Sequence, residues 1–244
     1  MSDKVLFGGN ETLLKKRIAA LDAIGSEYIL TKNGAMTIID DGITKKKYTT
    51  KPITTEGAKI MQCCKEVKRD ALKFLELNPD IESRTGAYEI TGTNLAFIGE
   101  WSKKNKDNDE IALVDLNHAY FRVAYLFGIV SEKTYLKWKD NRDARLIALG
   151  SFNRSAVSDL KKGDKVMETV KVENDLTPVW NYIVFKTYKA VISVCMQLNH
   201  QYFQFQTDGI YLPVELADKA MLMFDKFDLP SKKEIVKNKF NLKK

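Results

Sequence analysis

The stretch Tyr202-Phe-Gln-Phe-Gln-Thr-Asp-Gly-Ile-Tyr-Leu-Pro-Val-Glu215 predicts a β-hairpin that carries one carboxylate at its tip. Apolar and polar residues alternate before the central Asp-Gly pair, as they do in a half-buried strand, and a second apolar run follows the pair. Asp-Gly between two strand-like runs is a strong hairpin signal. Asp208 is therefore expected at the hairpin tip. Asp is also ordinary turn chemistry beside Gly, so the hairpin alone does not assign it a function.

A second carboxylate, Asp115, ends the apolar run Ile111-Ala-Leu-Val114, which predicts a buried strand, and a helix is expected over residues 116–129. A carboxylate at the end of a buried strand must be paired or must hold a cation. If the two strands are neighbours, Asp115 and Asp208 converge and repel each other, and a divalent metal ion would remove that conflict. The pair then predicts phosphoryl or nucleotidyl transfer. In an unrelated α+β protein, Asp115 would instead be a helix N-cap and Asp208 a turn residue.

A basic segment follows, and a helix is expected from Arg142 to Leu160. Lys139, Arg142 and Arg145 recur every three residues, which predicts one cationic helix face, and Phe152 lies two turns further along that face. Cations suit the phosphates of a nucleoside triphosphate and an aromatic ring suits its base. The alternative is a solvated helix face with one core aromatic.

The remaining patterns mix helices and strands. A short helix is expected over residues 12–24, a three-stranded meander over residues 28–49, an amphipathic helix from Thr55 to Leu77, a polar connector from Ser102 to Glu110 and a buried helix from Pro178 to Leu198. These patterns predict the α+β class.

Composition restricts the class of protein further. The 244 residues are 44% apolar and 29% charged, as in a soluble globular protein, and no apolar run is long enough for a membrane span, so a cytoplasmic protein is expected. Three cysteines and two histidines argue against a zinc site, a disulfide framework and a Ser-His-Asp triad. The net charge is +7, and residues 231–244 contain six Lys and one Glu, which predicts a solvated tail or a contact with phosphate groups.

Three segments, in order, resemble the motifs of the family B DNA polymerases. The palm motif Asp-x-x-Ser-Leu-Tyr-Pro-Ser resembles Asp115-Leu-Asn-His-Ala-Tyr-Phe-Arg122. The fingers motif Lys-x-x-x-Asn-Ser-x-Tyr-Gly resembles Arg145-Leu-Ile-Ala-Leu-Gly-Ser-Phe-Asn153. The motif Tyr-x-Asp-Thr-Asp-Ser resembles Gln204-Phe-Gln-Thr-Asp-Gly209, in which Gln replaces the first Asp. The match covers about residues 110 to 215, which is less than half of the chain.

The resemblance implies roles for individual residues. Asp115 and Asp208 would be the catalytic carboxylates and would bind two Mg²⁺ or Mn²⁺ ions. Tyr120 would pack under the sugar, Phe152 would lie against the nascent base pair and Arg145 would neutralise the triphosphate. Arg142 and the backbone of Leu116 and Asn117 would complete the nucleotide contacts.

The resemblance also implies an organisation and a function. Residues 1–104 would form an N-terminal α+β region, residues 105–230 a palm-like antiparallel sheet packed with helices, with short helical fingers at about 131–177, and residues 231–244 a basic tail. The function implied is that of a template-directed DNA polymerase, which acts on a DNA primer-template and deoxynucleoside triphosphates. A phage or mobile element is the expected source, and the cytoplasm of its bacterial host is the expected compartment. No exonuclease motif or full thumb is expected, so other replication proteins are expected partners. The alternative is a catalytically weak or inactive palm relative that acts as a nucleic-acid-binding protein or as a subunit of a replication complex.

Overall fold

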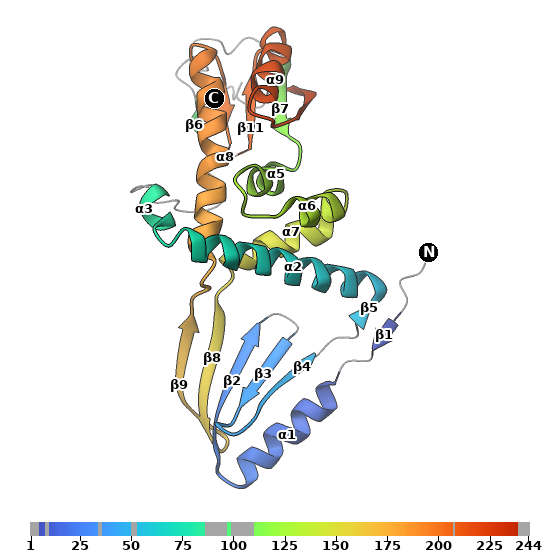
Figure 1. Ribbon diagram of the computed structural model, residues 1–244, viewed down its shortest axis with the longest axis vertical. Coiled ribbons are helices and arrows are strands. Elements are labelled where there is room, and N and C mark those ends of the chain that lie inside the picture. The colour runs from blue at the N-terminus through green and yellow to red at the C-terminus, as the bar shows by residue number, and fades with distance from the viewer. Residues whose placement is uncertain are drawn as a thin grey trace. The chain divides into compact units, whose positions relative to one another are not determined.

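The computed structural model describes residues 5–7, 10–33, 36–49, 53–85, 97–98, 110–206 and 208–238 (Figure 1). The chain has an α+β fold in which all paired strands are antiparallel. Contacts divide it into two compact units, each built from two separate stretches of sequence. Unit 1 contains residues 1–66 and 142–177, and unit 2 contains residues 67–141 and 178–244.

Unit 1 is built on a five-stranded sheet with the order β4-β3-β2-β8-β9. Its strands are β2 (Glu27–Asn33), β3 (Met36–Asp40), β4 (Lys45–Thr49), β8 (Ala156–Lys162) and β9 (Lys165–Val172). The predicted meander is confirmed by β2, β3 and β4, and helix α1 (Glu11–Ala23) confirms the predicted first helix. Alternate strand residues pack against α1 to form a core of Leu14, Leu21, Tyr28, Leu30, Ile39 and Tyr48. Strands β1 (Val5–Phe7) and β5 (Ile53–Thr54) form a separate pair.

The predicted helix over residues 142–160 is wrong beyond Gly150. Helix α7 (Arg142–Gly150) is followed by a short 3₁₀ turn, η1 (Ser151–Asn153), and then by β8. The hairpin of β8 and β9 turns at Gly163, whose φ of 60° suits glycine, and β9 is rich in β-branched residues. Pairing of β8 with β2 supplies backbone hydrogen bonds that local sequence spacing does not reveal.

Unit 2 is built on a second five-stranded sheet with the order β12-β7-β11-β10-β6. Its strands are β6 (Phe97–Ile98), β7 (Glu110–Leu116), β10 (Gln204–Phe205), β11 (Gly209–Leu212) and β12 (Ser231–Lys237). Strand β7 lies between β11 and β12 and is therefore paired along both edges (Figure 1). Residues 231–237 of the predicted tail form β12, and residues 239–244 lie outside the described part of the chain.

Helices cover one face of this second sheet. The long helix α8 (Thr177–Gln197) confirms the predicted buried helix, and its Tyr188 ring lies 5.8 Å from the ring of Phe205 in β10. Helix α9 (Ala217–Asp225) follows the turn η2 (Val214–Leu216) and packs on β7 and β12. Among the described residues of this unit, the other helices are α3 (Ile81–Thr85), α5 (Ala119–Leu126), α6 (Glu132–Trp138) and the C-terminal part of α2.

Helix α2 (Thr55–Leu77) has the bounds that the sequence predicts. Its buried residues Cys63, Val67 and Ala71 recur at spacings of four, as expected for one face of an amphipathic helix. The predicted connector and domain boundary near residue 104 lie outside the described residues. The predicted fingers range, 131–177, is shared between the two units and contains α6, α7 and the β8–β9 hairpin.

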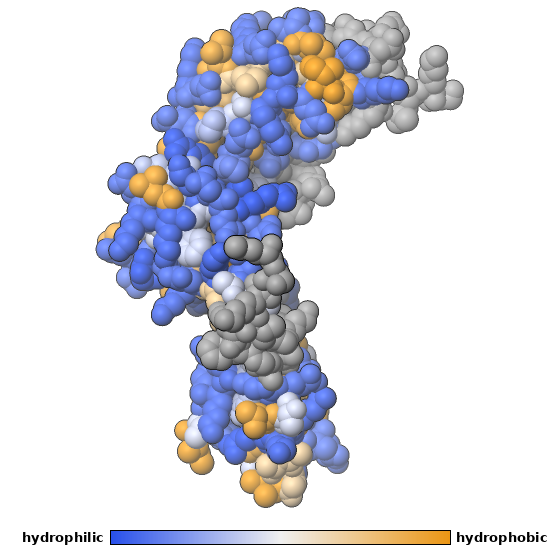
Figure 2. All heavy atoms as spheres, turned by 90° about the vertical axis from the view of Figure 1, so that its right-hand side faces the viewer, coloured by the Kyte–Doolittle hydropathy of each residue, from blue (hydrophilic) through white to orange (hydrophobic). Residues whose placement is uncertain are grey.

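The described residues on the face drawn in Figure 2 are mainly hydrophilic. Figure 2 shows hydrophobic side chains as separate patches among hydrophilic ones on the face it presents. Across the described residues, every helix is too short or too polar to cross a membrane.

Candidate functional site

The two predicted carboxylates lie together at one end of the unit 2 sheet. Strands β7 and β11 are antiparallel neighbours, and Asp115 is directly opposite Gly209. The backbone N–H of Leu116 donates a 2.9 Å hydrogen bond to the carbonyl of Asp208. The predicted adjacency of the two strands is therefore confirmed, and the fold brings together two carboxylates that are far apart in the sequence.

Asp208 lies at the tip of the predicted hairpin, which is also confirmed. Strands β10 and β11 pair Phe205 with Ile210, and the N–H of Gln206 donates a 2.7 Å hydrogen bond to the carbonyl of Gly209. These bonds close the turn around Asp208. Gln206, which stands where the polymerase motif has an acidic residue, thus contributes its backbone to the hairpin.

The environment of Asp208 opposes its negative charge. Burial raises the pKa of the Asp208 carboxyl above its ordinary value, and the nearby charge of Asp115 raises it further, whereas the backbone N–H of Asp208 acts to lower it. Both raising effects come from keeping an anion in a partly buried place next to another anion. A cation at this position would stabilise the charged form of both groups.

Gly209 allows the two strands to approach closely at the site. A Cβ atom at this position would lie 3.2 Å from the carbonyl oxygen of Val114 and 3.5 Å from Oδ1 of Asp115. A side chain there would therefore occupy the space beside the carboxylate. The sequence indicates turn chemistry for the Asp-Gly pair, and the structure shows that the glycine also leaves room next to Asp115.

Lys232 is a site residue that sequence reasoning did not identify. It lies in β12, directly opposite Asp115 on the other edge of β7, and its Nζ is 3.4 Å from Oδ2 of Asp115. The lysine-rich composition of residues 231–244 was the only signal, and it could not show which lysine faces the carboxylate. Asp115 therefore has a carboxylate on one side and an ammonium group on the other.

The turn between β7 and α5 does not support the predicted phosphate contacts of two backbone amides. The N–H of Leu116 donates to Asp208, and the N–H of Asn117 donates a 2.8 Å hydrogen bond to the carbonyl of Pro230. These bonds attach the end of β7 to its neighbours on both sides. Because both N–H groups already donate within the fold, the proposed site does not contain the backbone of Leu116 and Asn117.

Tyr120 lies in the first turn of α5, close in sequence to Asp115 and in the same unit. Its half-buried ring packs against Trp180 of α8, with 5.3 Å between ring centroids. His118 precedes the helix with a left-handed φ of 58°, so the chain turns sharply between the strand and the helix. The predicted contact of Tyr120 with a sugar is not tested by this arrangement and stays a prediction.

The predicted triphosphate and base contacts belong to unit 1, whereas the carboxylates belong to unit 2. In α7, Arg142 is exposed and Arg145 is buried, and helix α6 ends at Trp138, so the predicted single cationic face with Lys139 is wrong. Phe152 is only 1% exposed, and its carbonyl accepts a 3.2 Å hydrogen bond from Oγ1 of Thr177. The roles of Arg142, Arg145 and Phe152 stay predictions.

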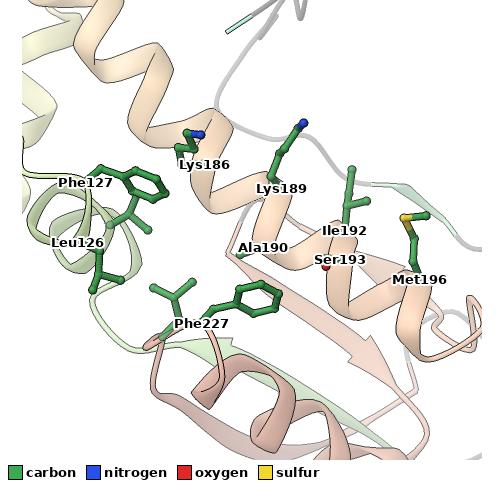
Figure 3. Close-up of a pocket in the computed structure, with 11 residues that line it drawn as sticks. Leu126, Phe127, Lys186, Lys189, Ala190, Ile192, Ser193, Met196 and Phe227 are labelled. Carbon is green, nitrogen blue, oxygen red and sulfur yellow. The ribbon is translucent and has the colours of Figure 1, made fainter. Parts of the chain in front are cut away.

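Unit 2 also has a groove of about 490 Å³ beside α8. Figure 3 shows Leu126 and Phe127 on one wall, Ala190 and Met196 from α8 on another, and Phe227 from the segment after α9. Its lining is mostly apolar, and no carboxylate is among the lining residues. This groove is therefore a separate feature from the paired aspartates.

The paired aspartates have the chemistry of a magnesium site. Carboxylate oxygens are ligands that Mg²⁺ prefers, and an ion between Asp115 and Asp208 would relieve the repulsion that raises the pKa of Asp208. Within the described residues, no group of three or more His, Cys, Asp and Glu side chains is arranged to hold a metal ion. The residues that would hold an ion here are thus Asp115 and Asp208.

Comparison with known proteins adds no further assignment, since no family model, curated protein or solved structure matches the chain.

Proposed function

We propose that the chain is a minimal, divergent DNA polymerase related to family B, which extends a DNA primer on a template by transferring nucleotides from deoxynucleoside triphosphates. The observation that carries the proposal is the meeting of Asp115 and Asp208 on adjacent strands. A pair of carboxylates that oppose each other's charge is costly for a purely structural sheet. Divalent cations bound by the two carboxylates would offset this electrostatic cost.

In the proposed reaction, different residues of the chain would bind the metal ions and the nucleotide. Asp115 and Asp208 would bind two Mg²⁺ or Mn²⁺ ions, which supply charge stabilisation for in-line displacement at phosphorus. Tyr120 would contact the sugar, whereas contacts of Arg142, Arg145 and Phe152 with the triphosphate and base stay predictions from the resemblance. Electrostatic positioning supplies most of the catalysis in phosphoryl transfer, so fixed charges on a rigid sheet suit the reaction.

The resemblance of the three motifs supports the setting proposed for this enzyme. The cytoplasm of a bacterial host is the proposed compartment, and a phage or mobile element is the proposed source. Other replication proteins are its proposed partners.

Primer extension tests the proposal. The full chain is given a primed DNA template, all four deoxynucleotides and Mg²⁺ or Mn²⁺, and is compared with Asp115→Ala and Asp208→Ala. Extension by the native chain and a loss of at least about 100-fold in each variant are expected, because each removes charge stabilisation of the transition state. Asp225→Ala, which changes an exposed carboxylate of α9, is the matched control and keeps full activity.

A second candidate is an inactive palm relative that binds nucleic acid or joins a replication complex. The specific observation in its favour is Gln206, a neutral residue where the polymerase motif has Asp, which leaves Asp208 as the carboxylate at the hairpin tip. DNA binding without extension by the native chain, with either metal ion, would favour this candidate over the enzyme.

A further inference from the structure

Lys232 shares a sheet face with Asp115. Residues directly opposite each other in neighbouring antiparallel strands point to the same side of the sheet, and Lys232 and Asp115 are such a pair. The Lys232 side chain is 61% exposed and that of Asp115 is 33% exposed. The ammonium group can therefore move away into solvent without unpacking any part of the core.

The next residue, Lys233, has a different position. Side chains alternate along a strand, so Lys233 points to the opposite face, where its Nζ donates a 2.6 Å hydrogen bond to Oδ1 of Asp218 in α9. Two consecutive lysines thus pair with carboxylates on opposite faces of one sheet. Only Lys232 faces the candidate metal site.

An ammonium group and a divalent cation compete for the same carboxylate. Lys232 contacts Oδ2 of Asp115, which is one of the oxygens that a metal ion would use. Each cation also repels the other, so both cannot remain in contact with the carboxylate at full strength. The ion pair with Lys232 therefore stabilises the site when metal is absent and opposes metal binding.

We infer that Lys232 is an internal counter-ion of the metal site, which a divalent cation must displace from Asp115 and which thereby lowers the affinity of the site for that cation. This inference rests on the proposed function, because it assumes that Asp115 and Asp208 bind metal. It adds a regulatory residue to the site: the metal affinity is set by a competing side chain as well as by the ligands.

Direct measurement of Mn²⁺ binding tests the inference without any activity assay. Free Mn²⁺ is followed by electron paramagnetic resonance during titration of the full chain and of Lys232→Gln, Lys232→Arg and Lys233→Gln. An exposed ion pair changes an equilibrium only modestly, so Lys232→Gln should bind Mn²⁺ about two- to fivefold more tightly. Lys232→Arg, which keeps the charge, and Lys233→Gln, which removes a charge on the other face, should bind like the native chain.

Two further variants, Asp115→Asn and Asp208→Asn, separate failure of this inference from failure of the proposed function. If both abolish Mn²⁺ binding but Lys232→Gln binds no more tightly than the native chain, the counter-ion inference is overturned and the metal site stands. Equal tightening by Lys232→Gln and Lys233→Gln also overturns it, since that would be a general charge effect. If the native chain does not bind Mn²⁺ at all, both proposals fail.

Discussion

At the scale of single residues, Asp208 gives the most direct prediction. Burial and the charge of Asp115 raise its pKa, so the folded chain holds a proton there more tightly than the unfolded chain. The group's contribution to stability is therefore greatest at low pH and is lost as pH rises through the raised pKa. Without divalent metal, Asp208→Asn should raise the melting temperature at pH 7, and the gain should shrink as the pH is lowered toward about 4.

Thermal unfolding followed by circular dichroism over a pH series measures this effect. Asp225→Asn, which removes an exposed carboxylate in the same unit, is the control and should leave the melting temperature nearly unchanged. A melting temperature of Asp208→Asn equal to or below that of the native chain at pH 7 would show that burial and Asp115 together do not oppose the charge of Asp208.

Some site residues can be predicted from local sequence patterns, whereas others depend on strand pairing between distant segments. Asp115 and Asp208 could be found because each lies in or beside a strand that the neighbouring residues alone predict. Lys232 could not be found, because only the register between β7 and β12 decides which lysine lies opposite Asp115. The buried position of Phe152 likewise depends on packing that its spacing from Arg145 does not show.

At the scale of elements, Asp70 of α2 links two helices of unit 2. Its Oδ2 accepts hydrogen bonds from the N–H and the hydroxyl of Ser131, at 3.0 and 2.6 Å, and Ser131 caps helix α6. Burial acts to raise the pKa of Asp70, but hydrogen bonds from Ser131, Thr134 and Arg69 outweigh it and hold the pKa below its ordinary value. The charged carboxylate therefore stabilises the folded chain.

Asp70→Asn should therefore lower the free energy of unfolding at pH 7 by about 1–3 kcal/mol, the usual range for hydrogen bonds to a charged group. The stabilisation is present above the pKa of the unfolded chain and is lost as pH falls through the lower folded value, so the difference should decrease below about pH 4. Urea unfolding at several pH values measures it. Glu76→Gln, an exposed change on the same helix, should have no such effect, and a pH-independent loss in Asp70→Asn would refute the charge explanation.

Elements with one clear period were predicted well. Helix α2 has a single apolar face along its length and matches its predicted bounds, and α8 is apolar on most sides and was also found. The segment after Gly150 has charged residues mixed with valines, which fits a helix surface as well as an exposed strand. Its pairing with β2, far away in the sequence, decides in favour of the strand.

At the scale of the whole molecule, each unit has its own core, and this predicts local responses to core mutations. Leu30, in the core of unit 1, is 6% exposed, and Leu212, in the sheet of unit 2, is fully buried. Replacing either with Ala should cost about 2–5 kcal/mol in the unit that contains it. Hydrogen exchange should accelerate in β2, β3 and β8 for Leu30→Ala, and in β7, β10 and β11 for Leu212→Ala. Equal acceleration in all of these strands in both variants would mean that the chain unfolds as one cooperative unit.

The division of the chain into two units could not be predicted from the sequence. A polar connector near residue 104 was the best local signal for a boundary, but each unit combines two distant stretches. Strand pairing between residues 27–32 and 157–162 joins the early and middle parts of the chain. Composition shifts along a sequence do not report such pairing.

The position of β7 between β11 and β12 has a consequence for how the protein is made. A ribosome synthesises Asp115 long before either strand that flanks it, so β7 leaves the exit tunnel with both edges lacking their final partners. Contacts between such distant segments form slowly, because a long intervening loop must first be closed. The carboxylate pair consequently cannot assemble during translation until the segment that contains Asp208 and β11 has left the exit tunnel.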